Sequence, residues 1–89
     1  MTLTFPNPSR SFDPDRDCIC FWGYDRTIEV VFFLEVSALQ RLCPDLGNNV
    51  AAGCLQAFDR VRDRIEKTAA KVYARGRGAH ACRLTTEDF

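Results

Sequence analysis

The feature that most constrains this chain is a long amphipathic pattern in its second half. Apolar residues recur there at spacings of three and four, which is the spacing of one face of an α-helix. The stripe consists of Cys54, Phe58, Val61, Ile65, Thr68 or Ala69, and Val72. Asn48 or Asn49 suits the N-cap that begins a helix, and Gly76 suits the left-handed position that often ends one. The pattern predicts one continuous helix from about Val50 to Arg75.

The surface that this helix needs is predicted in the first half of the chain, where residues 27–34 alternate as a strand does. One face of the strand carries Ile28, Val30, Phe32 and Leu34, and the other carries Thr27, Glu29, Val31 and Phe33. The second face changes from polar to apolar halfway along. This change leaves open whether the sheet is covered on both sides at that end.

The remaining segments complete a small α+β domain. Residues 3–5, 17–22 and 81–85 are predicted as strands, residues 37–42 as a short helix, and residues 7–11, 13–15 and 23–26 as turns or loops. The predicted order is β-β-β-α-α-β, with the helices on one face of a mostly antiparallel sheet. We expect residues 1–89 to form a single domain, because a chain of this length rarely holds two cores.

Charge is unevenly distributed although the formal net charge is zero. Residues 59–77 carry seven basic and three acidic side chains, whereas residues 1–58 are acidic overall. The first residues have neither the basic nor the apolar part of a secretory signal, so we expect a cytoplasmic protein. In that reducing compartment its five cysteines should be free thiols.

Several segments, in their order along the chain, resemble a known family. They are Leu3-Thr4-Phe5-Pro6, Cys18-Ile19-Cys20-Phe21, Ser37-Ala38-Leu39, residues 57–65, Ala69-Ala70-Lys71-Val72-Tyr73 and Asp88-Phe89. Together they resemble a bacterial family of about ninety-residue proteins known as domain of unknown function 1488, a length typical of one domain. The resemblance implies a small α+β fold and a bacterial origin. It implies no activity and brings no catalytic residues.

A row of basic residues on the predicted long helix is a candidate nucleic-acid or phosphate-binding site. The row consists of Arg60, Arg64, Lys67, Lys71 and Arg75, all within an arc of about 80° on the helix surface. Such a row can contact phosphates in a salt-dependent way, with Trp22 or Tyr24 stacking on bases. The simpler interpretation is a solvated helix face whose long side chains cover the edge of the core.

The cysteines offer a second candidate, a zinc site. Residues two apart on a strand point the same way, so Cys18 shares a face with Cys20, and His80 with Cys82. If the two strands were neighbours with matching faces, these four side chains would form a Cys₃His set. Structural zinc sites more often use Cys-x-x-Cys turns, so we predict no metal and no cofactor.

Aromatic and aliphatic residues near the predicted hairpin form the third candidate, an interface. Trp22 and Tyr24 lie close to the turn, and Val31 and Phe33 lie on the second face of the next strand. Exposed apolar patches of this kind often mark interfaces, and self-association would enlarge the core of a small domain. Phosphate-binding, dinucleotide and metalloprotease motifs are missing. We therefore predict a non-enzymatic interaction or homodimerisation module, with nucleic-acid binding by the basic row as the alternative.

Overall fold

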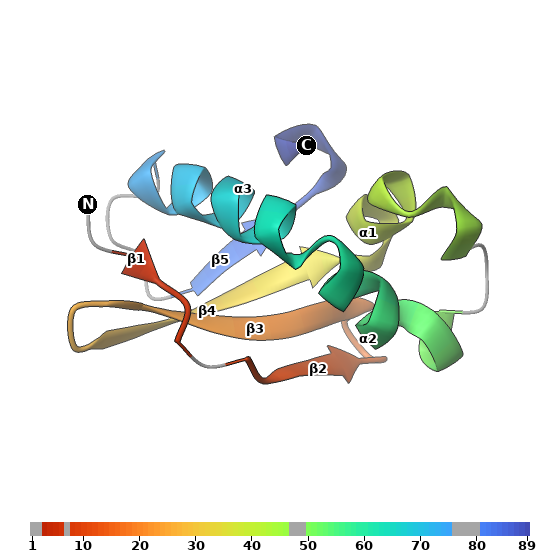
Figure 1. Ribbon diagram of the computed structural model, residues 1–89, viewed down its shortest axis with the longest axis horizontal. Coiled ribbons are helices and arrows are strands. Elements are labelled where there is room, and N and C mark those ends of the chain that lie inside the picture. Colours follow the sequence, from red (N-terminus) through yellow and green to blue (C-terminus); the bar gives the residue numbers. More distant parts are fainter. Residues whose placement is uncertain (1–2, 7, 47–49, 76–80) are drawn as a thin grey trace.

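The computed structural model describes residues 3–6, 8–46, 50–75 and 81–89, and in this part of the chain a mixed sheet is covered by helices on one face (Figure 1). The elements in chain order are β1 (Leu3–Thr4), β2 (Arg10–Asp13), β3 (Cys18–Asp25), β4 (Ile28–Glu35), α1 (Val36–Leu42), a 3₁₀ turn (Pro44–Leu46), α2 (Val50–Arg60), α3 (Arg62–Arg75), β5 (Ala81–Leu84) and a second 3₁₀ turn (Thr86–Asp88). The predicted α+β class and the one-sided helical layer are confirmed. The expected helix caps Asn48, Asn49 and Gly76 lie outside the described residues.

The five strands form one sheet in the order β1-β3-β4-β5, and β2 also pairs with β3. The pairs β1–β3, β2–β3 and β3–β4 are antiparallel, whereas β4–β5 is parallel. The parallel pair has a simple origin in the chain path. After β4 the chain passes through the helical layer before it returns as β5, and such a crossover brings a strand back in the same direction.

Two tight turns connect the central strands. Asp13 Oδ1 accepts hydrogen bonds from the N–H groups of Asp15 (3.0 Å) and Arg16 (3.3 Å), and Asp17 closes the turn with a positive φ of 53°. This confirms the turn predicted at residues 13–15. The β3–β4 hairpin needs only Arg26 and Thr27, so it is tighter than the predicted loop of residues 23–26.

The sequence pattern did not predict strand β2, since it indicated a turn that included residues 10–11. Its sequence, Arg10-Ser11-Phe12-Asp13, contains one large apolar residue and has no strand signal of its own. It is a strand because its backbone pairs with β3, from Arg10 opposite Phe21 to Asp13 opposite Cys18.

The prediction of one continuous helix is wrong, since α2 ends at Arg60 and α3 begins at Arg62. At the break the Val61 N–H donates to the carbonyl of Phe58, three residues back, at 3.2 Å. The apolar period nevertheless continues across the break. Phe58 on α2 and Ile65 on α3 are both fully buried, so each helix presses its own apolar side onto the sheet. With the break, α2 contacts β2 and α3 contacts β5.

The core lies between the helices and the facing side of the sheet. Phe21 stacks on Phe32 with ring centroids 5.2 Å apart, and Phe58 approaches Phe21 at 5.1 Å. The strand residues of this layer are all buried and alternate along the chain: Ile19, Phe21, Val30, Phe32, Leu34, Cys82 and Leu84. Within the described part of the chain, no helix is long and apolar enough to cross a membrane.

Candidate functional site

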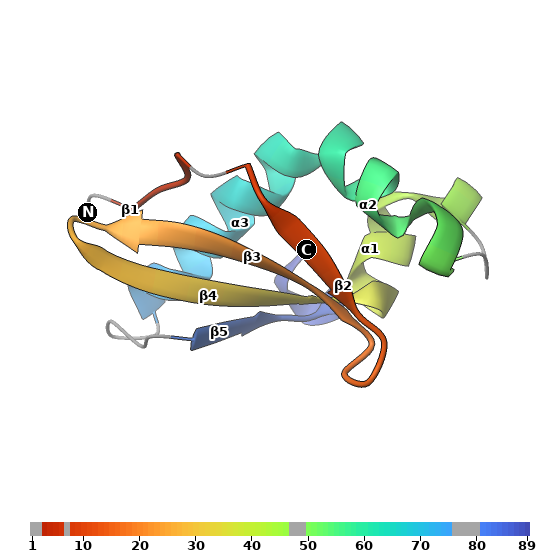
Figure 2. The ribbon, with the colours of Figure 1, turned by 90° about the horizontal axis from the view of Figure 1, so that it is seen from below.

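The face of the sheet opposite the core is the open sheet face, and it gathers the four residues predicted as an interface. In an antiparallel pair, residues directly opposite each other point to the same side. The register places Trp22 opposite Val31, Tyr24 opposite Glu29, and Cys20 opposite Phe33. Trp22, Tyr24, Val31 and Phe33 are all partly exposed. Seen from below, β3, β4 and β5 lie in front of the helices (Figure 2), so the described helices cover one side only.

Charged side chains frame this apolar centre unequally at its two ends. At the hairpin end, the Tyr24 hydroxyl donates to Glu29 Oε2 at 2.9 Å, and this bond raises the pKa of Tyr24. At the opposite end, the Arg16 guanidinium lies 5.3 Å from the centre of the Phe33 ring. Arg83, beside Phe33 on β5, donates to Glu35 at 2.6 Å. The hairpin end therefore carries Glu29, and the other end carries two ion pairs, Arg16 with Asp13 at 3.8 Å and Arg83 with Glu35.

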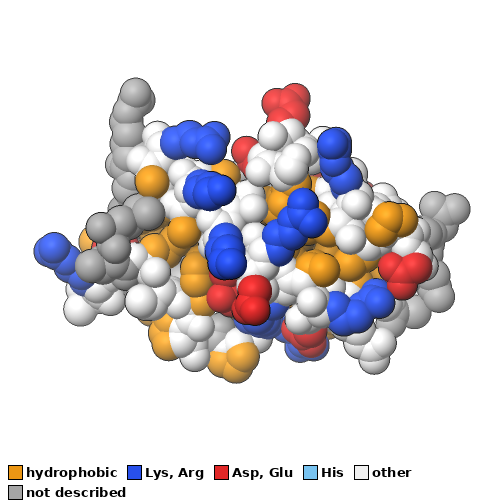
Figure 3. Space-filling view, turned by 45° about the horizontal axis from the view of Figure 1, so that its top comes forward, with side chains coloured by type: hydrophobic (Ala, Val, Ile, Leu, Met, Phe, Trp, Pro, Cys, Tyr) orange, Lys and Arg blue, Asp and Glu red, His pale blue; other side chains and the backbone are white. Residues whose placement is uncertain are grey.

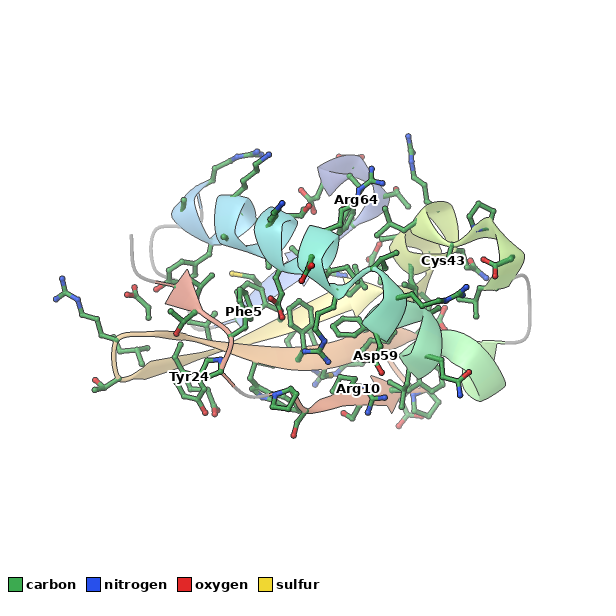
Figure 4. All side chains as sticks on the ribbon, in the orientation of Figure 1. Phe5, Arg10, Tyr24, Cys43, Asp59 and Arg64 are labelled. Atoms are coloured by element: carbon green, nitrogen blue, oxygen red, sulfur yellow. The ribbon has the colours of Figure 1, made fainter. Side chains whose placement is uncertain are left out.

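The basic row predicted on one helix is divided between two. Arg60 lies on α2 and forms an ion pair of 3.2 Å with Asp45. The other four, Arg64, Lys67, Lys71 and Arg75, are exposed on α3 and form no ion pair with any described residue. Lys and Arg side chains gather over this helix in Figure 3. Arg64 points away from the sheet in Figure 4, and Tyr24 lies on the other side of it. A nucleic-acid strand bound along α3 would therefore not reach Tyr24 or Trp22.

An ionic cluster that the sequence did not indicate joins the edge of the sheet to the helix break. Arg10 on β2 donates to both carboxylate oxygens of Asp59, at 3.0 and 2.8 Å (Figure 4). Arg62 donates to Asp59 Oδ1 at 3.3 Å and to the Pro8 carbonyl at 2.8 Å. The hydrogen bond from Arg10 lowers the pKa of Asp59. Forty-nine positions separate Arg10 and Asp59, so no local pattern could have shown that they meet.

This cluster lines a shallow groove with Pro8 and Ser9. A second shallow depression lies between the 3₁₀ turn and α2, lined by Asp45, Leu46, Gly53, Gln56 and Arg60. In both places the Asp and Arg side chains already pair with each other. Their charges are therefore largely neutralised within the protein, and neither depression presents a free charge to a ligand.

The five cysteines are free and buried, but they lie on different sides of the sheet. Cys82 pairs with Phe32 and belongs to the core layer, whereas Cys18 and Cys20 lie on the open sheet face. The Cys₃His set would have required Cys82 to share a face with Cys18 and Cys20, and the β5 register instead turns Cys82 toward the helices. His80 lies outside the described residues. Instead, the ligand atoms of Asp13, Cys18 and Cys20 all lie within 4.8 Å of one another.

Four of the five thiols, those of Cys18, Cys43, Cys54 and Cys82, lie in environments that work against an activated nucleophile. Burial, with Cys20 close by, raises the pKa of Cys18 to about 11. Burial also raises the pKa values of Cys43, Cys54 and Cys82. A thiol with a raised pKa is protonated at neutral pH and reacts slowly, because the thiolate is the nucleophile.

The fold and its surfaces define a small α+β domain with a mixed sheet, a one-sided helical layer and a partly apolar open face. A family model described as "Protein of unknown function (DUF1488)" matches residues 3–85 of the 89-residue chain. The chain belongs to this family, as the resemblance in its sequence indicated. No curated protein and no solved structure shows a significant match.

Proposed function

We propose that this protein is a non-enzymatic interaction module that forms a homodimer through the open sheet face. The observation that carries the proposal is the co-facial cluster of Trp22, Val31 and Phe33 on the side of the sheet away from the helices. Apolar side chains of this size gain free energy when a partner removes them from water. A second copy offers a matching surface at the same cellular concentration, and twofold dimers are the commonest oligomers.

The charges at the two ends of the face favour one arrangement of the two copies. A twofold axis running across the strands would turn the second sheet end to end. The hairpin end of one copy, with Glu29, would then meet the opposite end of the other, with Arg16. A twofold axis along the strands would instead bring Glu29 close to Glu29. Complementary charges select orientation, so the end-to-end dimer is the one we propose.

The size of the face indicates a weak dimer. Strands β3 and β4 have eight residues each, which at about 3.3 Å per residue gives a length of about 26 Å. Four strands about 4.8 Å apart give a width of about 19 Å, and hence a footprint of about 500 Å² per copy. Stable interfaces bury about 800 Å² per partner, so we expect a dissociation constant on the order of 10–100 μM.

Two lysine substitutions on the same strand test this proposal. Val31→Lys places a charge at the centre of the open sheet face. Ile28→Lys is the matched control, because Ile28 is 48% exposed and lies on the opposite side of β4. In sedimentation velocity across a concentration series, wild type and Ile28→Lys should dimerise alike, and Val31→Lys should remain monomeric. A wild-type chain that stays monomeric at several hundred micromolar, on the order of ten times the expected constant, overturns the proposal.

A charge exchange tests the orientation of the two copies. Glu29→Arg and Arg16→Glu should each weaken the dimer, because each places like charges together across the interface. The double variant should recover much of the wild-type affinity. If the single variants dimerise as wild type does, the end-to-end arrangement is wrong, although dimerisation through this face could still hold on the lysine test.

A second candidate function, phosphate-backbone binding, is supported by the four α3 cations without acidic partners in the described residues. Binding of a mixed-sequence oligonucleotide should weaken steeply with salt, because each phosphate contact releases counterions. Arg64→Glu with Lys67→Glu should abolish it, and Arg41→Glu, an exposed change on α1, should leave it unchanged. Binding that ignores salt, or that survives the double α3 variant, would exclude this function.

A further inference from the structure

Three side chains with metal-binding atoms meet at the turn end of the open sheet face. Cys18 and Cys20 are two residues apart on β3, so their thiols point to the same side. Asp13 on β2 is paired with Cys18 across the sheet. The two sulfur atoms and a carboxylate oxygen all lie within 4.8 Å of one another. We propose that Asp13, Cys18 and Cys20 form a three-ligand zinc site, whose ligands all come from one chain.

The spacing of the donor atoms suits a tetrahedral ion. Zinc–sulfur bonds of about 2.3 Å at a tetrahedral angle put two sulfur ligands about 3.8 Å apart. Donor atoms that already lie within 4.8 Å need shifts of about 1 Å or less, which side-chain rotation can supply.

The Asp13 carboxylate is already held in place on the protein side. Its Oδ1 accepts two backbone N–H groups from the turn that follows β2. Its Oδ2 is 3.8 Å from Arg16 Nε, which is too long for a hydrogen bond, so this oxygen keeps its lone pairs. A carboxylate that is fixed by one oxygen and available at the other loses little conformational freedom on binding a metal.

The donor set selects a thiophilic ion. Magnesium and calcium bind through oxygen ligands, whereas two thiolates with one carboxylate suit zinc. The ligands carry three negative charges against two on the ion, and Arg16, whose Nε lies 3.8 Å from Asp13 Oδ2, can offset the difference. The Asp13 side chain is 32% exposed, so an ion could reach the site from the Asp13 side.

Zinc would also link strand β2 to strand β3 through its ligands. The ligands lie on both sides of the Pro14–Asp17 turn, and Cys18 is fully buried. Because the unfolded chain does not hold these ligands together, binding adds to the stability of the folded state. Coordination requires the thiols to lose their protons, so the affinity should increase with pH.

The test is calorimetric titration of zinc into the reduced, untagged full chain at low micromolar concentration. We expect one zinc per chain, with an affinity that falls at least about tenfold in Cys20→Ser and in Asp13→Asn, since even outer-shell changes at zinc sites cost that much. The Asn oxygen can still accept the turn hydrogen bonds, so Asp13→Asn should keep its fold, as circular dichroism would verify. Cys82→Ala is the matched control, because this thiol belongs to the core layer.

Cobalt gives a second measurement that does not depend on affinity. Cobalt bound to Cys18 and Cys20 should show thiolate-to-metal charge-transfer absorption together with the intense visible bands of a tetrahedral ion. Absence of one-to-one zinc binding, a cobalt spectrum without thiolate ligation, or equal losses in Cys82→Ala and Cys20→Ser would each overturn the site. The dimer is measured separately by sedimentation without metal, so failure of either proposal leaves the other standing.

Discussion

The two faces of the sheet are built from alternate residues of the same strands, yet they differ in how they are covered. Val30, Phe32 and Leu34 on β4 face the helices and are fully buried. Their neighbours Val31 and Phe33 face the other side and remain partly exposed. The difference does not come from hydrophobicity, since both sets are apolar. It comes from the crossover through α1, α2 and α3, which covers only one side.

This comparison separates residues that hold the fold together from residues that are available to a partner. A buried phenylalanine stabilises the folded state through the contacts that surround it on every side. A partly exposed phenylalanine loses only part of its contact with water when the chain folds. An interface can remove the rest of its apolar surface from water. Adjacent positions on one strand should therefore respond very differently to the same substitution.

The largest expected effect contrasts Phe32→Ala with Phe33→Ala. Removing the Phe32 ring from the stack with Phe21 should lower the free energy of unfolding by about 3–5 kcal/mol. Removing the Phe33 ring should lower that of the monomer by about 1 kcal/mol or less, because part of its surface is already in water. Urea denaturation at low micromolar concentration, where the proposed dimer is dissociated, measures both.

A small domain could lose its structure altogether in Phe32→Ala, since its total stability is on the order of 5–10 kcal/mol. Phe32→Leu and Phe33→Leu provide a milder pair, with the same order expected and a smaller difference. Equal losses at the two positions would show that both faces are covered in solution.

The next effect concerns how closely the covered face is packed. Gly23 lies on β3, next to the residues that pair with β1, and an added Cβ would come within 2.9 Å of Phe5 Cε1 and 3.2 Å of Phe32 Cε2. Gly23→Ala should therefore lower the free energy of unfolding by about 1–3 kcal/mol. Phe5→Leu removes the nearest atom. Gly23→Ala should therefore lower the free energy of unfolding by less in the Phe5→Leu variant than in wild type. Additive losses in thermal or urea unfolding would argue against this close contact.

The sequence predicted the two faces of the central strands well, because alternation along Ile28–Glu35 is local information. It missed β2 and the break at Val61, because neither has a local signal. β2 owes its conformation to pairing with β3, and the helix break contains neither glycine nor proline. At Val61 the apolar period of three and four simply continues into the next helix.

The candidate sites show the same division between local and long-range information. The co-facial position of Trp22 and Val31 required only the hairpin, which the sequence indicated. The separation of Cys82 from Cys18 depended on the register of β5 against β4, and the approach of Asp13 depended on the unrecognised strand β2. Registers between distant segments are set by the packing of the whole domain, so alternation alone could not provide them.

The smallest expected effect concerns the polar rim of the covered face, meaning the two ion pairs that Asp59 and Asp45 form at its edge. It measures how much these ion pairs add to the stability of the folded state. Asp59 is 45% exposed and receives two hydrogen bonds from Arg10, whereas Asp45 is 68% exposed and receives one from Arg60. Asp59→Asn should lower the free energy of unfolding by about 0.5–1 kcal/mol, and Asp45→Asn should have almost no effect.

The pH dependence separates this ion pair from a packing effect. The pKa of Asp59 is lowered from its ordinary value of 3.8 in the folded protein, so the unfolded chain takes up the proton first as pH falls. The contribution of Asp59 is therefore fully present at neutral pH and is lost on acidification below about pH 4. The difference between wild type and Asp59→Asn should then become smaller in urea denaturation as the pH is lowered from 7 to 3. A difference that stays constant from pH 7 to pH 3 would mean that Asp59 acts through its shape and not its charge, and that the rim adds no electrostatic stabilisation to the covered face.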